Sequence, residues 1–474
     1  MPKISPHELQ DNLQRTTAAT TFCYVVSDNP VKPSKPNTIE AVVHGKLCNT
    51  CGACSVACPV NAITYKETVG GHVFPVIDDE LCTNCGLCLN VCAGKADNPK
   101  LLNALPANPF QGECREAWVG RSNDDAVYRA GQSGGVVTQL LINLLESGEV
   151  DACAVVNMQP GNPPRAVPFL ARNREDVMTA QKSKYCPVPL LQVLREAKET
   201  NSRIAIVGLS CHLHGLKLLE DVIDLKAVVK YKIGLICAGV MSCASIDYLV
   251  NKTKSKCSIS DFRFRDKTRT GYPGDVTVRD ERDNVSIIPK SERMAIKDFF
   301  TPARCRVCFD KMNVLADVTV GDPWGLQGVD KQNGESVVIA RTETGSSLIT
   351  NSLNKGTLTL RKVNYEDVVQ GQKIDNKSRE WRTYCELWQA HGQELPGFSQ
   401  TVISHVKDLH VATTSYRFSF NNALRLDRQH SRGDLICKTR RILTKRKCEK
   451  SICRLFKLLH RALRKIRIPQ CNRN

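Results

Sequence analysis

The sequence has no long hydrophobic run and few aromatic residues. No window of its 474 residues approaches the roughly 20 apolar residues that a membrane-spanning helix requires. The first residues, Met1-Pro2-Lys3-Ile4-Ser5, lack the apolar core of a secretory signal peptide. With 42% hydrophobic and 6% aromatic residues, the composition is that of ordinary globular domains, and the length suggests about three of them. We therefore expect a cytoplasmic protein in a reducing compartment.

Cysteine, in contrast, is abundant. The chain has 23 cysteines, and an odd number in a reducing compartment argues against a disulfide framework. Eight of them form two runs of identical spacing, Cys48-x2-Cys51-x2-Cys54-x3-Cys58 and Cys82-x2-Cys85-x2-Cys88-x3-Cys92. This is the bacterial ferredoxin pattern, in which three cysteines of a run ligate one [4Fe–4S] cluster and the fourth ligates its neighbour. The pattern predicts one cluster on Cys48, Cys51, Cys54 and Cys92, and a second on Cys82, Cys85, Cys88 and Cys58.

A pair of zinc sites is the alternative for these runs. Structural zinc sites usually combine paired C-x2-C arms or add histidines, and three cysteines in one run fit that geometry poorly. Glycine recurs at Gly52 and Gly86, the same place in each run, which indicates an internal repeat. Between the runs, residues 62–65 and 73–76 favour a small hairpin.

Beyond residue 114, short apolar strands alternate with helical patterns up to about residue 370. Clear examples of such strands are residues 152–156, 204–207 and 232–236. The alternation predicts an α/β domain. In open α/β sheets, ligands tend to bind beyond the carboxyl ends of the strands.

Two segments of this domain are candidates for binding a cofactor. A glycine-rich turn over residues 129–135 precedes an apolar, helix-like run from Val136, and such a turn offers free N–H groups to a flavin or nucleotide phosphate. A tight turn without a ligand is the alternative. The segment 182–185 adds two lysines and a tyrosine that could stack on a ring. By composition alone, it is equally an ordinary surface segment.

Four further cysteines follow strand ends or have metal-type spacing. Cys211 comes after the strand 204–207, Cys237 ends the strand 232–236, and Cys305 and Cys308 form a C-x2-C pair. Together they supply the four thiolates that one more [4Fe–4S] cluster requires. Buried structural thiols and half of a zinc site are the alternative interpretation.

Taken in order, these motifs resemble the family of coenzyme F420 hydrogenase/dehydrogenase β subunits, over roughly residues 45 to 365. The resemblance rests on the two cysteine runs and on Gln132 to Thr138, Lys182 to Tyr185, Gly208 to His212, Cys237, Phe264 to Lys267, Cys305-x2-Cys308 and Ala316 to Gly325. One departure is Leu209-Ser210, where the family often has Thr-Pro before the cysteine.

The resemblance implies a flavin beside the third cluster. The implied FAD is held partly by Gly131, Gln132, Ser133, Gly134 and Gly135 and by Lys182, Ser183, Lys184 and Tyr185. The implied third [4Fe–4S] cluster lies on Cys211, Cys237, Cys305 and Cys308, close to the flavin. His212 and His214 are candidate proton donors, although a histidine pair at a helix start is more often structural.

We expect a ferredoxin-like domain followed by a larger mixed α/β domain and a basic helical tail. The segments are a polar stretch at 1–40, the two-cluster ferredoxin-type domain at 41–100, a flavin-binding part at 114–200, a part with the third cluster's cysteines at 201–370, a helical and irregular extension at 371–425 and a basic amphipathic tail at 426–474.

The expected function is that of an iron–sulfur flavoprotein oxidoreductase. Its clusters would exchange single electrons with ferredoxin or another redox protein, and its FAD would exchange hydride with reduced coenzyme F420 or an organic substrate. Some members of the family occur among surface-polysaccharide genes, so that metabolism is one setting. The alternative is an electron-relay subunit of a larger complex, without a substrate of its own.

The tail carries most of the charge. From Arg425 onward, seventeen Lys or Arg oppose three acids, which gives +14 of the total net charge of +18. Apolar residues recur at helical spacing between Ile452 and Ile466, with Lys and Arg between them. Such a helix favours peripheral binding to an anionic membrane surface on the inner face, and docking on a protein partner is the alternative. We expect no nucleic-acid binding, because no recognisable binding fold accompanies the charge.

Overall fold

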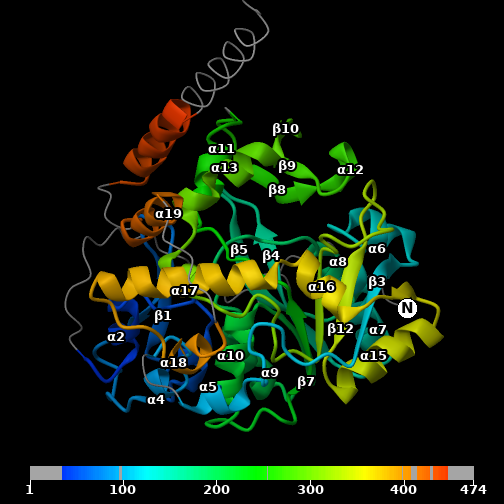
Figure 1. The fold of residues 1–474 in the computed structure, drawn as a ribbon, viewed down its shortest axis with the longest axis horizontal. Helices are drawn as coiled ribbons and strands as arrows, with labels where there is room; N and C mark the ends of the chain where they lie inside the picture. The colour runs from blue at the N-terminus through cyan, green and yellow to red at the C-terminus, as the bar shows by residue number, and fades with distance from the viewer. Residues whose placement is uncertain are drawn as a thin grey trace, which may run out of the picture.

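A mixed eight-stranded sheet forms the centre of the molecule (Figure 1). The computed structural model describes residues 35–95, 99–253, 255–397, 399–406, 414–426 and 431–446. The strand order is β13-β3-β12-β11-β7-β6-β4-β5. The strands are β3 (Glu116–Ser122), β4 (Ala152–Gln159), β5 (Arg165–Ala171), β6 (Ile204–Gly208), β7 (Val229–Leu235), β11 (Val318–Gly321), β12 (Ser336–Ala340) and β13 (Leu358–Lys362).

The four inner strands β4, β6, β7 and β11 run parallel, and the outer strands are antiparallel to their neighbours. Val207 of β6 is paired with Ile233 of β7, and Ile233 with Val318 of β11. The carboxyl ends of β6, β7 and β11 therefore meet at one edge of the sheet. This arrangement confirms the predicted mixed α/β domain.

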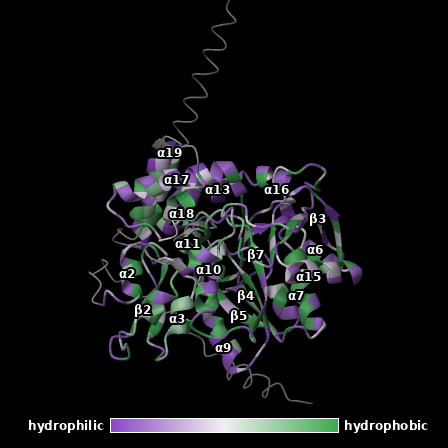
Figure 2. Ribbon diagram, turned by 60° about the horizontal axis from the view of Figure 1, so that its bottom comes forward, coloured by the Kyte–Doolittle hydropathy of each residue, from purple (hydrophilic) through white to green (hydrophobic). Residues whose placement is uncertain are grey.

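Helices cover both faces of the sheet, because alternate strand residues point to opposite sides. Cys153 and Val155 of β4 pack with α7 (Val136–Glu146) and α15 (Glu343–Asn354), whereas Ala152 and Ala154 pack in the core that contains α9 (Leu194–Glu199) and α10 (Ser210–Leu219). In Figure 2, hydrophobic residues gather along the central strands and purple residues lie toward the periphery. Smaller elements of these layers are α6 (Asp125–Ala130), α8 (Arg174–Thr179) and the 3-10 helix η1 (Leu190–Val193).

The ferredoxin-type part contains the predicted hairpin. Strands β1 (Ile63–Glu67) and β2 (Val73–Ile77) pair antiparallel, with Ile63 opposite Ile77. The recurring glycines cap two short helices, with φ of 99° at Gly52 before α3 (Ala53–Ala57) and 74° at Gly86 before α4 (Leu87–Asn90). Glycine adopts this left-handed conformation without strain. The part also contains α2 (Ile39–His44), and α5 (Pro99–Ala104) follows it.

A second, smaller sheet forms its own core. It has the order β10-β9-β8 and consists of β8 (Ile259–Asp266), β9 (Asp275–Asp280) and β10 (Val285–Ile288). Its core includes buried residues of α11 (Ala244–Val250) and α13 (Lys290–Phe300), and also Leu435, Ile436 and Leu443 from the C-terminal part. Short helices α12 (Lys267–Thr270) and α14 (Ala303–Arg306) follow β8 and α13.

The C-terminal helices pack on the body of the protein. They are α16 (Tyr365–Gly371), α17 (Ile374–Ala390), α18 (Ser399–Ile403) and α19 (Thr414–Leu424), and residues 432–446 are also helical. Arg432 donates to the carbonyl oxygens of Thr68 and Val69 in the β1–β2 hairpin, 2.6 Å from each. The amphipathic pattern between Ile452 and Ile466 lies outside the described residues. Among the helices that are described, none is both long and apolar enough to cross a membrane.

Candidate functional site

The four cysteines predicted for the first cluster, here called the first set, lie together in the ferredoxin-type part: Cys48, Cys51, Cys54 and Cys92. Burial, followed by the charges of Cys51, Cys48 and Cys92, raises the pKa of the Cys54 thiol well above its usual value. Backbone N–H groups point at two of the sulfurs, from Thr50 to Cys48 Sγ (3.3 Å) and from Gly94 to Cys92 Sγ (3.3 Å). Hydrogen bonds to cysteine sulfur are one means by which a protein tunes a bound cluster. The fold therefore brings Cys92 of the second run to the cysteines of the first.

The cysteines predicted for the second cluster, here called the second set, are Cys82, Cys85, Cys88 and Cys58. In this set, Cys58 of the first run lies near Cys88 of the second run. Burial raises the pKa of the Cys88 thiol, and the nearby charges of Cys85 and Cys58 add to the rise. The N–H of Ala62 donates to Cys58 Sγ at 3.3 Å, and Cys85 is exposed at the surface. Cys82 follows β2, and its N–H donates to the carbonyl oxygen of Asp78 at 3.0 Å. In the described part of the chain, no three or more His, Cys, Asp or Glu are gathered around a position for a single metal ion.

The third set of cysteines surrounds a small internal cavity of about 50 Å³. Cys211 lies in the first turn of α10 after β6, Cys237 follows β7, Cys305 lies on α14 and Cys308 follows it. All four line this cavity, as does Cys48 of the first set. The N–H of Gly239 donates to Cys237 Sγ at 3.4 Å. The parallel strands thus bring Cys211 and Cys237 to one place, and the α14 segment adds Cys305 and Cys308, almost 100 positions after Cys211.

Helix α10 connects the third set to the first. Cys211 and Gly215 are one helical turn apart, and a Cβ atom at position 215 would lie only 3.0 Å from Cys51 Sγ. The charge of Cys51 is also among those that act on Cys211, after burial and the charges of Cys237 and Cys308. Glycine at 215 therefore lets the first cysteine set approach this helix closely.

Arg304 is a buried cation between these two sets, and the sequence analysis did not single it out. It is 3% exposed, and its positive charge acts on Cys48, Cys51 and Cys92 of the first set and on Cys308 of the third. A guanidinium here favours negative charge on both sets. The only feature of the sequence that could have indicated this role is that Arg304 directly precedes Cys305.

The two predicted cofactor segments meet at one place. The N–H of Ser183 donates to Gln132 Oε1 at 3.0 Å, which joins the segment 182–185 to the glycine-rich turn. Cavities of about 200 and 170 Å³ lie there and share Thr138, Lys182 and Tyr185 in their walls. Gly131, Gln132, Ser133 and Gly135 line the larger cavity, at the N-terminal end of α7. An anion there would face the free N–H groups of that helix.

Residues far along the chain support the glycine-rich turn. Lys267 Nζ donates to the carbonyl oxygens of Ser133 (2.6 Å) and Asn333 (2.8 Å), and burial lowers the pKa of Lys267 to about 8. The N–H of Gly134 donates to Ser336 Oγ at 3.0 Å. Lys267 belongs to a motif that carried the family resemblance, but no sequence pattern indicated that it acts at the turn.

Tyr185 and Lys184 are already engaged by protein groups. The guanidinium of Arg293 lies 5.3 Å from the centre of the Tyr185 ring, and Arg265 Nη1 donates to the Tyr185 hydroxyl at 3.3 Å. Arg265 also pairs with Asp322, beyond the end of β11, at 2.6 Å. The ammonium of Lys184 donates to the carbonyls of Ala180 and Gln181, and burial lowers its pKa to about 7. Stacking of Tyr185 on a flavin ring stays a prediction.

The two candidate histidines are held by protein partners. His212 Nδ1 accepts the N–H of Leu209 at 3.1 Å, so its Nε2 carries the proton and donates to Val188 O at 3.1 Å. Burial lowers the pKa of His212 to about 4. His214 Nε2 is hydrogen-bonded to Asp310 Oδ2 at 3.0 Å. This geometry favours the structural role for both.

The smaller cofactor cavity borders the third cysteine set directly. Cys237 and His212 line both that cavity and the cavity among the cysteines. The remaining wall of the cofactor cavity is largely apolar and includes Val137, Val207 and Leu235. A ring bound in it would therefore be shielded from water and adjacent to the cysteines.

Three models of known families match successive parts of the chain. Two models of the coenzyme F420 hydrogenase/dehydrogenase beta subunit match the chain, the one for its C terminus over residues 201–366 and the one for its N-terminal part over residues 117–195. A "4Fe-4S dicluster domain" model matches residues 47–96. These matches define an iron–sulfur redox protein. The chain belongs to the family of coenzyme F420 hydrogenase/dehydrogenase β subunits.

Several curated proteins are similar over much of the chain. The F subunit of the F(420)H(2) dehydrogenase of Methanosarcina mazei is 29% identical over 65% of this chain and 83% of its own length. The coenzyme F420-dependent sulfite reductase of Methanocaldococcus jannaschii is 27% identical over 72% of this chain, which spans half of that protein. A chain of the F420-reducing [NiFe] hydrogenase complex from Methanosarcina barkeri has a TM-score of 0.47 at 21% identity, covering 60% of this chain and 95% of that one.

Proposed function

We propose that this protein is a flavin- and iron–sulfur-dependent oxidoreductase that passes electrons between [4Fe–4S] clusters and FAD. When bound, the flavin supplies two-electron hydride chemistry and the clusters carry single electrons. The observation that carries the proposal is that the cofactor cavity, the third cysteine set and the first cysteine set adjoin one another in that order. The cofactor cavity shares Cys237 with the third cysteine set, and α10 links that set to the first.

The proposed metal ligands are the twelve cysteines of the three sets. The donor set fits, because Cys48, Cys51, Cys54 and Cys92 lie together, the four cysteines of the third set line one cavity, Cys58 and Cys85 lie near Cys88, and backbone N–H groups point at four of the sulfurs. Exposed Cys85 in the second set offers the point where an external redox protein, such as a ferredoxin, approaches. Arg304 stabilises negative charge on the first and third sets.

The proposed flavin contacts follow from the cavities beside the glycine-rich turn. The N-terminal N–H groups of α7 bind the diphosphate, and Gln132 orients Ser183 through its hydrogen bond. Lys267 holds the turn through the Ser133 carbonyl. Val137, Val207 and Leu235 exclude water from the ring. Both ring nitrogens of His212 are engaged, so we assign it a positioning role beside the ring and not proton transfer.

The hydride partner has two candidates. The relatives from the two Methanosarcina species and Methanocaldococcus are named for coenzyme F420, which supports the reduced deazaflavin as donor. An organic substrate, including one of surface-polysaccharide metabolism, is the other. A relay subunit without its own substrate is the alternative function, favoured by the relatives named as subunits of larger enzymes.

Anaerobic purification with cofactor analysis tests the proposal. We expect about twelve irons and one FAD per chain, since each of three clusters holds four irons. Reduced F420, NADH and reduced ferredoxin are then screened for bleaching of the flavin absorbance. Iron without flavin would favour the relay subunit, and zinc without flavin would overturn both functions.

A further inference from the structure

The two ferredoxin-type cysteine runs have the same spacing but different surroundings. Cys54, the third cysteine of the first run, lies 3.7 Å from the hydroxyl oxygen of Tyr65 on β1. Cys88 is the corresponding cysteine of the second run, and the residue that follows it at the same separation is Pro99, which has no side-chain donor. The repeat alone would give two equivalent clusters, whereas the neighbouring side chains distinguish the first set from the second.

The Tyr65 hydroxyl can donate to the Cys54 sulfur. A tyrosine hydroxyl keeps its proton at neutral pH and a thiolate bound to iron has none, so Tyr65 is the donor of this pair when a cluster is bound. Tyr65 is also hydrogen-bonded to Ser55 Oγ at 3.0 Å. Since a hydroxyl both donates and accepts, Ser55 can donate to Tyr65 when the Tyr65 proton lies toward Cys54. In the second run, Leu89 stands in place of Ser55 and has no hydroxyl.

A buried guanidinium adds a full charge beside the same set. Arg304, 3% exposed, lines the internal cavity together with Cys48, and its Nη1 donates to the carbonyl oxygen of Val307 at 3.3 Å. Its positive charge acts on three of the four cysteines of the first set, Cys48, Cys51 and Cys92. Charge in a protein interior is screened far less than charge in water, so Arg304 favours an added electron at these cysteines.

The same charge reaches the third set, where an acid opposes it. Arg304 favours the thiolate of Cys308, whereas the charge of Asp310 acts in the opposite sense. Asp310 is 1% exposed and lines the same cavity. Removal of Arg304 should therefore affect both sets, while the Tyr65 hydroxyl should act on the first set.

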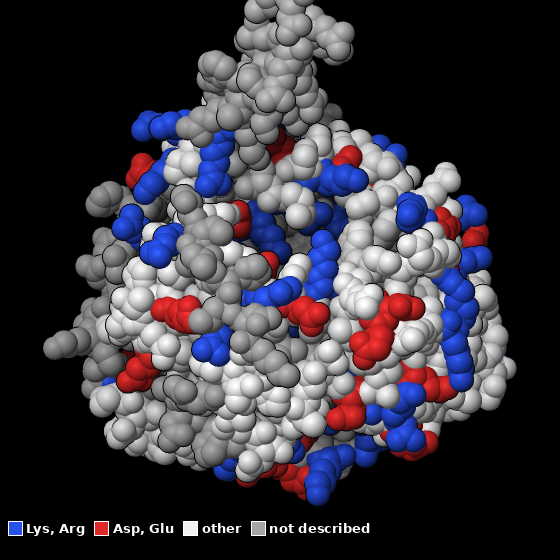
Figure 3. Space-filling model, in the orientation of Figure 1, with Lys and Arg blue, Asp and Glu red and all other residues white. Residues whose placement is uncertain are grey.

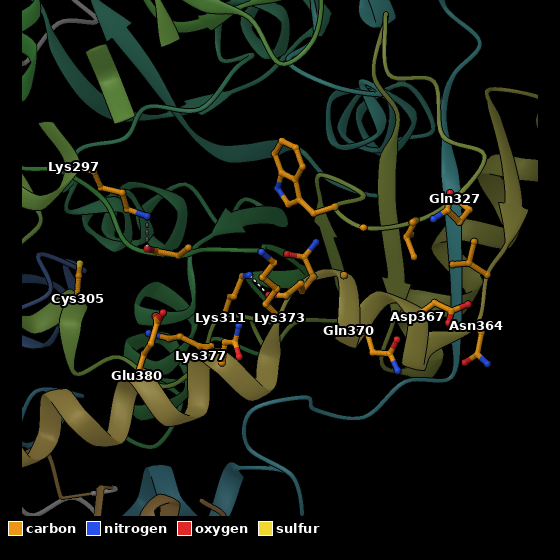
Figure 4. Close-up of a pocket in the computed structure, with 18 of the residues that line it drawn as sticks. Lys297, Cys305, Lys311, Gln327, Asn364, Asp367, Gln370, Lys373, Lys377 and Glu380 are labelled. Atoms are coloured by element: carbon orange, nitrogen blue, oxygen red, sulfur yellow. Dashed lines mark hydrogen bonds between the residues drawn. The ribbon is translucent and has the colours of Figure 1, made fainter. Parts of the chain in front are cut away.

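Two lysines near the third set lie, in contrast, on the walls of an open cleft. Figure 3 shows the face that carries α17 hollowed at its centre, with Lys and Arg side chains around the hollow. Lys297, Lys377 and Cys305 all line this cleft, whose volume is about 1380 Å³ (Figure 4). Lys377 also lines the cavity of the third set. Water that enters the cleft screens its charge, so Lys377 should affect the clusters less than buried Arg304 does.

We infer that Tyr65 and Arg304 raise the reduction potential of the first cluster, so that it accepts an electron more readily from either neighbouring cluster. In this step one electron moves, the donating cluster is oxidised, the first cluster is reduced, and no bond forms or breaks. The reduced cluster carries one more negative charge, which the Tyr65 O–H dipole and the Arg304 charge both stabilise. The inference deepens the proposed function and rests on it for the presence of the clusters.

Redox titration of the full-length protein under anaerobic conditions, followed by EPR, tests the inference. The signal of the first cluster is the one that Cys51→Ser lacks. In Tyr65→Phe, which removes only the hydroxyl, we expect the equilibrium constant for reducing this cluster to fall about tenfold, which is about 59 mV for one electron. In Arg304→Met we expect a fall of about ten- to a hundredfold in the first cluster and a fall in the third cluster as well. Arg304→Lys keeps the charge and should restore both potentials.

Matched controls separate these effects from general ones. Tyr365→Phe loses the hydrogen bond from its hydroxyl to the Gln111 carbonyl oxygen and should leave every potential unchanged. Lys377→Gln removes a cation from the open cleft and should shift the potentials less than Arg304→Met does. An unshifted first-cluster potential in Tyr65→Phe or in Arg304→Met would overturn the inference, and so would equal shifts in Lys377→Gln and Arg304→Met.

Iron and flavin are measured on every variant. If Arg304→Met loses iron, Arg304→Gln, which keeps a side-chain donor for the Val307 carbonyl oxygen, takes its place in the test. Clusters without flavin in the unaltered protein would overturn the proposed oxidoreductase and leave the inference about the first cluster standing. Full iron and flavin with unshifted potentials would overturn the inference alone.

Discussion

The ferredoxin-type part and the α/β domain hold their cysteines in different ways. In the ferredoxin-type part, eight cysteines fall between residues 48 and 92, and short loops bring them together. In the α/β domain, four cysteines come from separate segments between residues 211 and 308. Cys211 and Cys237 meet because β6 and β7 are parallel neighbours that end at the same edge of the sheet, and the α14 segment brings Cys305 and Cys308 to them.

This difference shows what maintains each site. A local site depends on its own turns, such as those capped by Gly52 and Gly86. A site assembled by topology depends on packing elsewhere. The segment that carries Cys305 and Cys308 is held by α17, since Trp381 Nε1 donates to the carbonyl oxygen of Val307 at 3.0 Å.

The sharpest test of this contrast removes one cysteine from each region. Cys51→Ser and Cys237→Ser should each lose about four of about twelve irons, because a [4Fe–4S] cluster requires four thiolates. Cys237→Ser should retain both ferredoxin-type signals in the EPR spectrum of the reduced protein, whereas Cys51→Ser should lose one. Cys153→Ser, buried outside the three sets, should keep all its iron. Loss of all iron in both variants would show that the regions do not assemble independently.

Truncation of Trp381 tests whether the third set depends on distant packing. Trp381 is fully buried, so Trp381→Ala should cost about 3–5 kcal/mol of unfolding free energy. We also expect it to lower the iron of the third set and to spare the ferredoxin-type clusters. Trp381→Phe keeps most of the packing and loses the hydrogen bond to Val307, which should cost about 1 kcal/mol. Urea unfolding and iron analysis measure both effects, and full iron in Trp381→Ala would contradict the dependence.

The same contrast explains what could be predicted from the sequence. The ferredoxin hairpin and the strands at 152–156 and 204–207 follow from local patterns, and the structure confirms them. The grouping of Cys211 with Cys305 was inferred only through strand ends and family resemblance. The role of Arg304 had no local signal beyond its place beside Cys305. The role of Lys267 had none, because Lys267 contacts Ser133 from 134 positions away.

The tail illustrates the limit of a periodic pattern. Its basic, amphipathic spacing predicted binding to a membrane surface or to a protein partner. Where the tail is described, Leu435, Ile436 and Leu443 pack into the core of the small sheet. That segment is therefore part of the fold, and the membrane prediction concerns only the residues beyond it.

Arg432 connects the helix over residues 432–446 to the ferredoxin-type part. The ferredoxin-type part therefore also depends on a contact that is distant in the sequence. Its guanidinium donates to Glu67 Oε1 at 2.7 Å and to the carbonyls of Thr68 and Val69. Arg432→Met should cost about 2–3 kcal/mol, since hydrogen bonds to charged groups are lost and Glu67 retains its ion pair with Arg165. Limited proteolysis should then cut near residue 431 sooner. Lys438→Met, at an exposed position of the same helix, should change neither measurement; equal cutting in both variants would contradict the anchoring role.

The smallest expected effect concerns the pH dependence of flavin retention. Burial lowers the pKa of Lys267 to about 8, so its ammonium is charged below that pH and loses its proton above it. Deprotonation weakens its hold on the Ser133 carbonyl, and FAD should therefore dissociate more readily as the pH rises from 7 to 9. Lys267→Gln can still donate hydrogen bonds but has no charge to lose, so its FAD affinity should be lower at pH 7 and constant with pH. Equilibrium dialysis at each pH measures this, and an unchanged pH profile in Lys267→Gln would show that another group titrates at the turn.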